Sequence, residues 1–270
     1  MSDRVMAAMV VVLAWWASTG VVLRLVWLPR RTHIASVIVM TALAGGGGVA
    51  VYETLGVTTA EAAYTAFGGA LALWAWHELV FLLGWVTGPH RTPWAPGGTG
   101  WRRFVQATSV LIHHEVALAV TFLALAAPSV GAANRVAAWT FGVLWVMRLS
   151  AKFNVFLGVR NVSVEFVLPH LRYLTTYFRR APMNALMPVS LLVGGGMVVA
   201  LGAHALGWRA GSMVGQPGAG AAFGVTAHTL IATILVLALV EHLCLVLPLP
   251  DAMLWRWLLR DLRREARSDV

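Results

Sequence analysis

Acidic and imidazole side chains stand next to each other at three places inside long apolar stretches of this sequence. The three clusters are His77-Glu78, His113-His114-Glu115 and Glu241-His242. A charged group at membrane depth costs about 2.5–3.5 kcal/mol, so such residues are rare and usually have a purpose. Imidazole and carboxylate groups that project inward from facing helices bind iron, zinc or manganese. The clusters therefore predict a metal site, and a di-iron centre is the favoured form.

The spacing inside the clusters limits this hypothesis. The sequence has no Glu-x-x-His and no His-x-x-x-His among them, the spacings that place two ligands on one helix face. His113, His114 and Glu115 are consecutive and cover about 200° of a helix, so they cannot all join one site. His113 instead continues a polar stripe with Gln106 and Ser109. Three alternatives stay open: His–Glu hydrogen bonds that fix packing, ligation of a pigment, and a proton relay.

Two further histidines raise the question of haem. His228 and His242 are fourteen residues apart, which places them on nearly the same helix face about 21 Å apart. His204 is a potential partner for His228, but no second apolar stretch supplies partners for both histidines at a matching spacing. We therefore expect His204 and His228 to be packing histidines.

The composition is that of a membrane protein. Of 270 residues, 59% are hydrophobic and only 11% are charged, and the mean hydropathy is +0.75. Soluble domains are nearer a quarter charged, so most of this surface faces lipid. The single cysteine, Cys244, excludes a disulfide framework. The net charge of +9 does not indicate a nucleic-acid partner, because the basic residues stand at the ends of apolar stretches.

Seven stretches approach or exceed the roughly 20 apolar residues that cross a bilayer, so the sequence predicts an all-α, polytopic membrane helical bundle in one domain, 1–270. The predicted spans are 5–27, 34–52, 62–86, 104–127, 136–156, 183–206 and 221–247. The segment 254–267 has Leu and Trp on one face and arginines around the rest, which predicts an amphipathic surface helix. Glycine runs at 45–48 and 194–196 predict close helix contacts.

The distribution of Lys and Arg predicts the orientation. With a cytoplasmic C-terminus, nearly all basic residues beside the spans are cytoplasmic, and only Arg4, Arg135 and Arg209 lie on the other side. An odd number of spans then places the N-terminus outside. At 1.5 Å per residue, the three His–Glu clusters lie about 9–14 Å below the cytoplasmic boundary. Groups at one depth can meet if their helices are neighbours.

A second polar constellation follows the fifth predicted span. Its members are Arg148, Lys152, Asn154, Gly158, Asn161, Glu165 and His170. If the helix continues unbroken to Pro169, the residues from Asn154 to Glu165 form one stripe at a spacing of three and four. We expect it to be the floor of a polar cavity or a partner surface, with a helix facing lipid headgroups as the alternative. Asn154, Asn161 and His170 are the candidates for cofactor binding, and Lys152 or Glu165 for proton transfer.

Several short motifs resemble one known family. The motifs are Trp76-His77-Glu78, Val86-Thr87-Gly88-Pro89, His113-His114-Glu115, the block 152–161, Glu165-Phe166, the block 169–174 and Pro182-Met183-Asn184. Together they resemble the PuhE family of photosynthetic complex assembly proteins, encoded beside the reaction-centre H subunit in anoxygenic phototrophic bacteria. The resemblance covers nearly the whole chain, and the block 152–161 is its most specific part.

The resemblance implies an accessory role in the bacterial inner (cytoplasmic or intracytoplasmic) membrane, with a periplasmic N-terminus. The implied partners are reaction-centre or light-harvesting subunits and pigment-synthesis enzymes, and the implied ligand is bacteriochlorophyll or a precursor. The family has no established catalytic residues to carry over. The alternative is an intramembrane di-iron oxidase or hydroxylase that acts on a tetrapyrrole or lipid-soluble substrate.

Overall fold

The computed structural model describes residues 2–94, 100–162, 164, 167–208, 213–216 and 220–247. The predicted proton-transfer residue Glu165 and the predicted amphipathic helix 254–267 lie outside this range. Within it the chain is helical, and the only β-type pairings are two isolated bridges, Asn134 with Gly215 and Val159 with Arg180. The prediction of an all-α bundle is confirmed for the described part of the chain.

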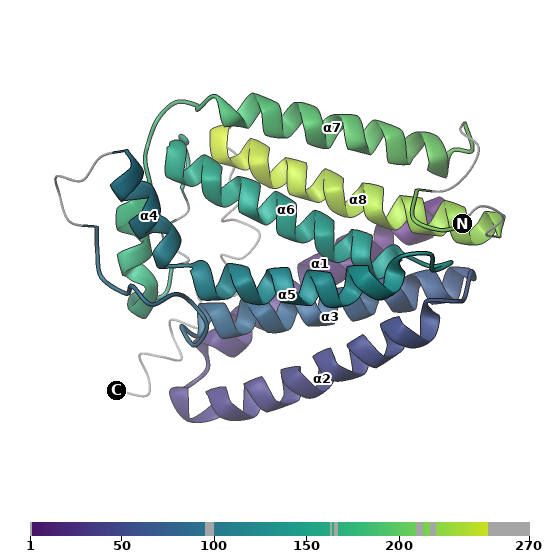
Figure 1. Cartoon of the computed structure of the whole chain (residues 1–270), viewed down its shortest axis with the longest axis horizontal. Helices are drawn as coiled ribbons and strands as arrows, with labels where there is room; N and C mark the ends of the chain where they lie inside the picture. Colours follow the sequence, from purple (N-terminus) through teal and green to yellow (C-terminus); the bar gives the residue numbers. More distant parts are fainter. Residues whose placement is uncertain are drawn as a thin grey trace.

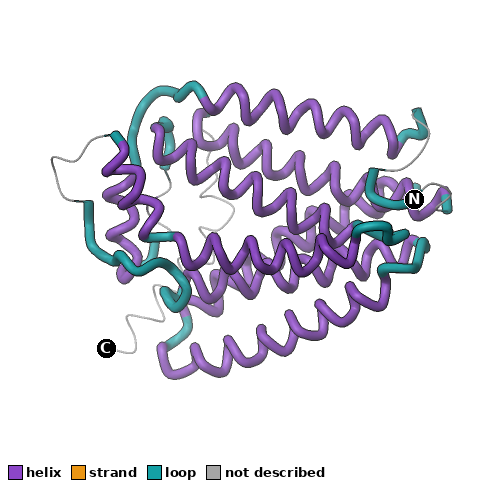
Figure 2. The backbone as a smooth tube through the Cα atoms, in the orientation of Figure 1, coloured by secondary structure: helices purple, strands orange, loops and turns teal. Residues whose placement is uncertain are grey.

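The described chain forms eight α-helices and two 3₁₀ segments (Figures 1 and 2). They are α1 (Asp3–Trp27), η1 (Arg30–Thr32), α2 (His33–Thr54), α3 (Ala60–Leu82), α4 (Trp101–Ser109), α5 (Ile112–Ser129), α6 (Val136–Leu157), η3 (Pro169–Tyr177), α7 (Leu186–Ala205) and α8 (Ala221–Val246). Side-chain hydroxyls cap two of them: Ser2 accepts from Val5 N at the start of α1, and Thr59 accepts from Ala62 N at the start of α3. These caps satisfy backbone donors that a helix start leaves free.

Six of the described helices are long and apolar enough to cross a membrane: α1, α2 (counted from Arg30), α3, α5, α7 and α8. α6 is as long as its neighbours but carries Arg148 and Lys152. It runs the length of the bundle between α5 and α7, packed on α3 and α8 (Figure 1). Apolar faces shared by α1, α3, α6 and α8 form the main core around Phe67, Phe141 and Leu230.

The loops gather at two ends of the bundle. At one end, which we call the α4 end, His170 of η3 bonds Leu82 O and Asn161 N donates to Leu245 O at 2.9 Å. At the opposite end, Asn134 N donates to Leu55 O at 2.9 Å and pairs with Gly215. Successive long helices alternate between these ends, so Glu78 late in α3, Glu115 early in α5 and Glu241 late in α8 all lie toward the α4 end.

The prediction of one helix over 104–127 is wrong, because the chain breaks between α4 and α5. The loop after α3 inserts its backbone at this break: His90 N donates to Ser109 O at 3.5 Å, and His114 N donates to Thr87 O at 3.0 Å. Gly88 allows the approach, since a Cβ there would lie 2.0 Å from Ser109 O. The loop thus satisfies backbone groups that a continuous helix would satisfy internally.

The unbroken helix that a single polar stripe beyond Asn154 would require does not form. α6 ends at Leu157, and Gly158 has φ 127°, a conformation that a glycine adopts without strain. Asn154 therefore stays inside the bundle, while Asn161 turns to the end of α8 and donates from Nδ2 to Cys244 O at 3.1 Å. The two amide side chains therefore bond different helices, Asn154 to α7 and Asn161 to α8.

The glycine runs do mark close helix contacts. A Cβ on Gly69 of α3 would lie 2.5 Å from Gly47 O of α2, and one on Gly194 of α7 would lie 2.7 Å from the Leu239 side chain of α8. Small residues let backbones approach where lipid provides no hydrophobic drive between helices. Here they fix the α2–α3 and α7–α8 pairs.

Candidate functional site

Arg148 of α6 and two acidic side chains face a cavity inside the bundle whose remaining lining is mostly apolar. Arg148 Nη2 donates to Glu78 Oε2 of α3 at 3.2 Å. Glu241 Oε1 of α8 accepts from Trp15 Nε1 of α1 at 3.1 Å. All four side chains line a cavity of about 260 Å³, together with Ser18 and other residues of these helices. We call Trp15, Glu78, Arg148 and Glu241 the charged centre.

The cavity suits a polar occupant. Its volume of 260 Å³ has room for roughly eight water molecules at about 30 Å³ each. Arg148 exposes 43% of its side chain and Glu78 13%, and Glu78 Oε1 has no hydrogen-bond partner among the described residues. Ionisable groups at this depth are expensive in hydrocarbon. Water, or the polar part of a ligand, would complete their hydrogen bonding.

A second ion pair joins α6 to α5. Lys152 Nζ lies 2.6 Å from Glu115 Oε1, and the other carboxylate oxygen accepts from Trp145 Nε1 at 3.2 Å. The two charged side chains are 20% and 16% exposed. Lys152 Nζ also lies 5.5 Å from the ring centroid of Phe81. Lys152 is thus held inside the bundle rather than free at its mouth.

Two of the predicted metal ligands lie near each other beside this pair. The rings of His77 and His114 are 6.4 Å apart at their centroids, and His77 Nε2 bonds Thr121 Oγ1 at 2.8 Å. His114 is fully buried against Phe81, with ring centroids 4.5 Å apart, and neither of its ring nitrogens has a partner among the described residues. His114 is the least satisfied buried polar side chain of the cluster.

His242 and Asn154 belong to a third group, a hydroxyl network between α6, α7 and α8. Ser150 Oγ donates to Ser190 Oγ at 2.9 Å and lies 3.0 Å from His242 Nε2. Asn154 Nδ2 donates to Ser190 Oγ at 3.2 Å, and Asn184 Nδ2 donates to Asn154 O at 3.1 Å. These contacts explain both residues as ties between helices.

The predicted site residues therefore divide among different partners. The three glutamates accept from different donors: Glu78 from Arg148, Glu115 from Lys152 and Glu241 from Trp15. His113 lies exposed on α5. Among the described residues, no three His, Cys, Asp or Glu side chains are grouped closely enough to hold a metal ion. The di-iron centre stays a prediction. His170 Nε2 bonds the backbone carbonyl of Leu82 at 2.9 Å, at the end of α3.

Arg103 ties α4 to the ends of α6 and η3 at the α4 end of the bundle. Its Nη2 donates to Phe156 O at 3.1 Å and to Tyr177 O at 2.8 Å, and its guanidinium stacks 4.1 Å from the Phe156 ring centroid. Burial, and then the nearby charge of Arg179, lowers the pKa of Arg103 from its ordinary value. Burial raises the pKa of Tyr177. Through their hydrogen bonds both groups act as structural ties at this end.

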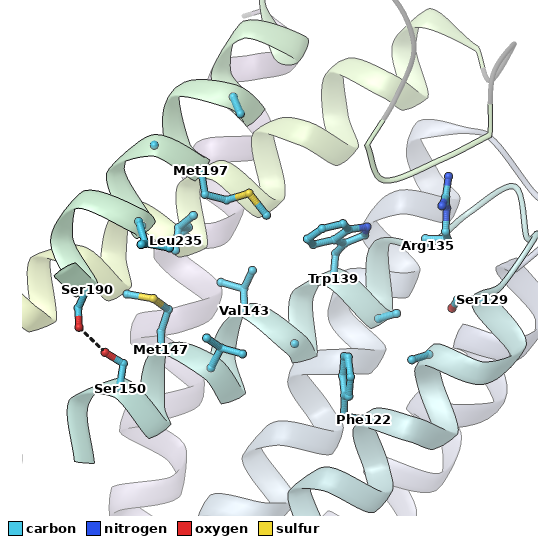
Figure 3. A pocket seen from close by; sticks show the side chains of 18 of the residues that line it. Phe122, Ser129, Arg135, Trp139, Val143, Met147, Ser150, Ser190, Met197 and Leu235 are labelled. Carbon is cyan, nitrogen blue, oxygen red and sulfur yellow. Dashed lines mark hydrogen bonds between the residues drawn. The ribbon is translucent and has the colours of Figure 1, made fainter. Parts of the chain in front are cut away.

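A second, larger cavity was not anticipated from the sequence. It is a groove of about 930 Å³ between α5, α6 and α7, with Leu235 of α8 at its base (Figure 3). Arg135 lies at one end and the Ser150–Ser190 pair at the other. Three glycines that line the groove were its only visible sign in the sequence: Gly142 and Gly194 make close contacts, and Gly196 leaves open space. Which helices flank the groove depends on how they pack, and the sequence does not reveal that packing.

The packing role expected for His204 and His228 fits the contacts. Their rings stack with centroids 4.9 Å apart at an interplanar angle of 16°. Met213 N donates to His228 Nε2 at 3.0 Å, and Nδ1 bonds Gly224 O at 2.6 Å. Both ring nitrogens of His228 are thereby engaged by the backbone, which leaves neither for haem.

Comparison with known proteins places this bundle in a family. The match to the family described as "Protein of unknown function (DUF3623)" covers residues 1–266. The chain belongs to the DUF3623 family. A relative from Rhodobacter capsulatus is 32% identical over 276 residues, covering 99% of this chain and 95% of the relative, and is described as "Uncharacterized 30.4 kDa protein in puhA 5'region". No solved structure matches this DUF3623 chain.

Proposed function

We propose that this DUF3623 protein is an accessory factor for the photosynthetic apparatus of an anoxygenic phototrophic bacterium. It supports assembly of reaction-centre or light-harvesting complexes, or supplies bacteriochlorophyll or a precursor to them. The observation that carries the proposal is the relative whose description places it in the 5′ region of puhA. The motif resemblance to the PuhE family, encoded beside the reaction-centre H subunit, supports the same role.

The proposal includes a topology of seven spans in the inner membrane. α6 has the length of a span and alternates in direction with its neighbours, and its two cations are neutralised by Glu78 and Glu115. Pairing removes much of the cost that Arg and Lys would carry at this depth. The N-terminus is then periplasmic and the C-terminus cytoplasmic, because the basic loops lie at the α4 end.

The charged centre and the groove support a role in handling membrane-borne molecules. The charged centre brings charged side chains to a cavity in the cytoplasmic half of the proposed topology, and the groove is a largely apolar surface along α6. A pigment or its precursor is an amphiphile with a polar macrocycle edge and an apolar body. A protein that presents both kinds of surface at membrane depth suits the transfer or protection of such a molecule.

The test is a chromosomal deletion in a phototrophic bacterium that carries the gene, complemented with the wild-type gene or with Arg148→Gln. We expect the deletion to lower the near-infrared absorbance of assembled pigment complexes several-fold, and Arg148→Gln to restore it only in part. Val39→Ala, at a lipid-facing position of α2 that is 66% exposed, is the matched control and restores it fully. A deletion strain with unchanged pigment complexes would disprove the proposal.

Purified protein also decides the di-iron alternative. An iron content near a pair of ions per chain, lost in Glu78→Ala, would support an enzyme of the di-iron carboxylate type. Metal-free protein that copurifies with bacteriochlorophyll would support the accessory role instead.

A further inference from the structure

The short helix α4 lies across one end of the bundle, transverse to the long helices (Figure 1). The break before α5 allows this direction, and side chains of α4 fix it. Arg103 Nη2 donates to Phe156 O at 3.1 Å and to Tyr177 O at 2.8 Å. The Phe104 ring packs against the rings of Phe153 and Phe156, at centroid distances of 6.4 and 6.0 Å. The outer face of α4 therefore points away from the bundle in a fixed direction.

The outer face of α4 combines apolar and basic side chains. Trp101 is 74% exposed, and Val105, four residues later and so on the same face, is 46% exposed. Arg102 beside them is exposed as well. The Trp101 ring stacks on Phe104 at 5.2 Å, and Phe104 stacks on Phe153 of α6, which is itself 37% exposed. The apolar surface of α4 thus continues onto the exposed apolar surface of α6.

The neighbouring segment η3 has an outer face of a different kind. It lies at the same end of the bundle, where Arg103 of α4 donates to its last carbonyl. Its exposed residues are Pro169, His170, Arg172 and Thr176, and no large apolar side chain of η3 is exposed. Water solvates such a face, whereas an indole and an isopropyl group are favoured at the boundary between lipid headgroups and acyl chains. The two segments therefore belong in two environments, α4 in the membrane interface and η3 in water.

The charge at this end favours an anionic surface. The segments between the long helices here are 28–32, 83–94, 100–111 and the described part of 158–185. Each of them contains arginine, and their described residues include no Asp or Glu. The negative potential of a leaflet that is rich in anionic lipids attracts basic segments close to its surface. Arg102 can therefore meet lipid phosphate without competition from a described carboxylate of these segments.

We propose that α4 is an interfacial helix that binds the anionic headgroup layer of the membrane, with Trp101 and Val105 at the acyl-chain boundary and Arg102 on lipid phosphate. A lipid layer fits better than a soluble partner, because the outer face of α4 is continuous with the surface of α6 that faces lipid in the proposed topology. The inference goes beyond the proposed function, since α4 would bind such a layer whether or not the protein serves the photosynthetic apparatus.

Spin-label EPR of the full-length protein in lipid nanodiscs tests the position of α4. In a Cys244→Ser background, a nitroxide is attached at Val105→Cys on α4 or at Arg172→Cys on η3. Collisions with oxygen report the bilayer, and collisions with a neutral, water-soluble nickel chelate report water. In discs of phosphatidylcholine and phosphatidylglycerol, we expect the nickel accessibility on α4 to be several-fold lower than on η3, and the oxygen accessibility to be higher.

A matched pair of charge reversals tests the anionic contact. Arg102→Glu and Arg172→Glu make the same change of charge at two exposed positions of the same end. With the label at Val105→Cys, Arg102→Glu should raise the nickel accessibility several-fold in discs that contain phosphatidylglycerol, and Arg172→Glu should leave it within about twofold. In discs of phosphatidylcholine alone, the effect of Arg102→Glu should be smaller. The apparent Tm of each variant in detergent shows that both are folded.

Three results would overturn the proposal. One is equal nickel accessibility at Val105→Cys and Arg172→Cys, since α4 would then face water and be open to a soluble partner. Another is an equal effect of the two charge reversals. The third is an Arg102→Glu effect of the same size with and without phosphatidylglycerol, since the contact would then not depend on anionic lipid.

Discussion

Lys152 of α6 and Glu115 of α5 form an ion pair at 2.6 Å inside the bundle, with Trp145 holding the second carboxylate oxygen. A few residues away on α6, Arg148 pairs with Glu78 of α3. One helix thus carries two cations whose partners come from two different neighbours. The pairs fix the position of α6 within the bundle and neutralise its charge.

The Lys152–Glu115 pair should stabilise the fold as a unit. Glu115→Leu leaves Lys152 buried without its counter-ion, which we expect to cost about 3 kcal/mol, and Lys152→Leu should cost about as much. The double variant should lose far less than the sum of the two. A double-mutant cycle of unfolding in mixed micelles measures this, and additive losses would show that the pair contributes no coupling.

Asn154 should be a stabilising tie between α6 and α7. It is fully buried, and its side chain donates to Ser150 O and to Ser190 Oγ. Asn154→Ala leaves the Ser190 hydroxyl with one partner fewer and should cost about 1–3 kcal/mol. Thermal unfolding in detergent checks the value. Asn161→Ala, at the α8 terminus, is the comparison and should lower the Tm less.

The α2–α3 contact should depend on one glycine and not on its neighbour. A Cβ on Gly69 would lie 2.5 Å from Gly47 O, whereas one on Gly68 meets nothing within 4 Å. Gly69→Ala should therefore separate the helices and lower the Tm by several degrees, while Gly68→Ala should leave it unchanged or raise it. Equal effects of the two variants would contradict the contact.

Cysteine labelling should show that α6 crosses the membrane. In a Cys244→Ser background, Val130→Cys places a single exposed thiol in the loop before α6, and Arg172→Cys places one in η3 after it. An impermeant maleimide should label Val130→Cys in intact spheroplasts and Arg172→Cys only after lysis. Labelling of both before lysis would mean that α6 does not span, and the reverse pattern would invert the orientation.

Much of the fold follows from hydropathy, and the exceptions have physical causes. The ends of α1, α6 and α8 lie within a few residues of prediction, because long apolar stretches bounded by polar residues leave little choice. The α4–α5 break was missed since it depends on a distant loop that inserts Thr87 and Gly88. Hydropathy does not register a backbone hydrogen bond from another segment.

The sequence identified the ionisable residues inside the bundle but not how they pair. The acids in the spans were recognised, yet Arg148 and Lys152 were assigned to a second constellation, a cavity floor or partner surface, rather than to Glu78 and Glu115. Counting charges within the spans would have suggested the pairs, because buried charges need partners of opposite sign. The groove had no such signal, since its walls are ordinary apolar residues brought together by packing.

The break between α4 and α5 also links the surface to the interior. Thr87 O accepts from His114 N in the first turn of α5, and the next residue, Glu115, is the partner of Lys152. The buried Thr87 carbonyl therefore fixes the turn that carries this carboxylate. The backbone of one loop thereby helps to set where the ion pair inside the bundle forms.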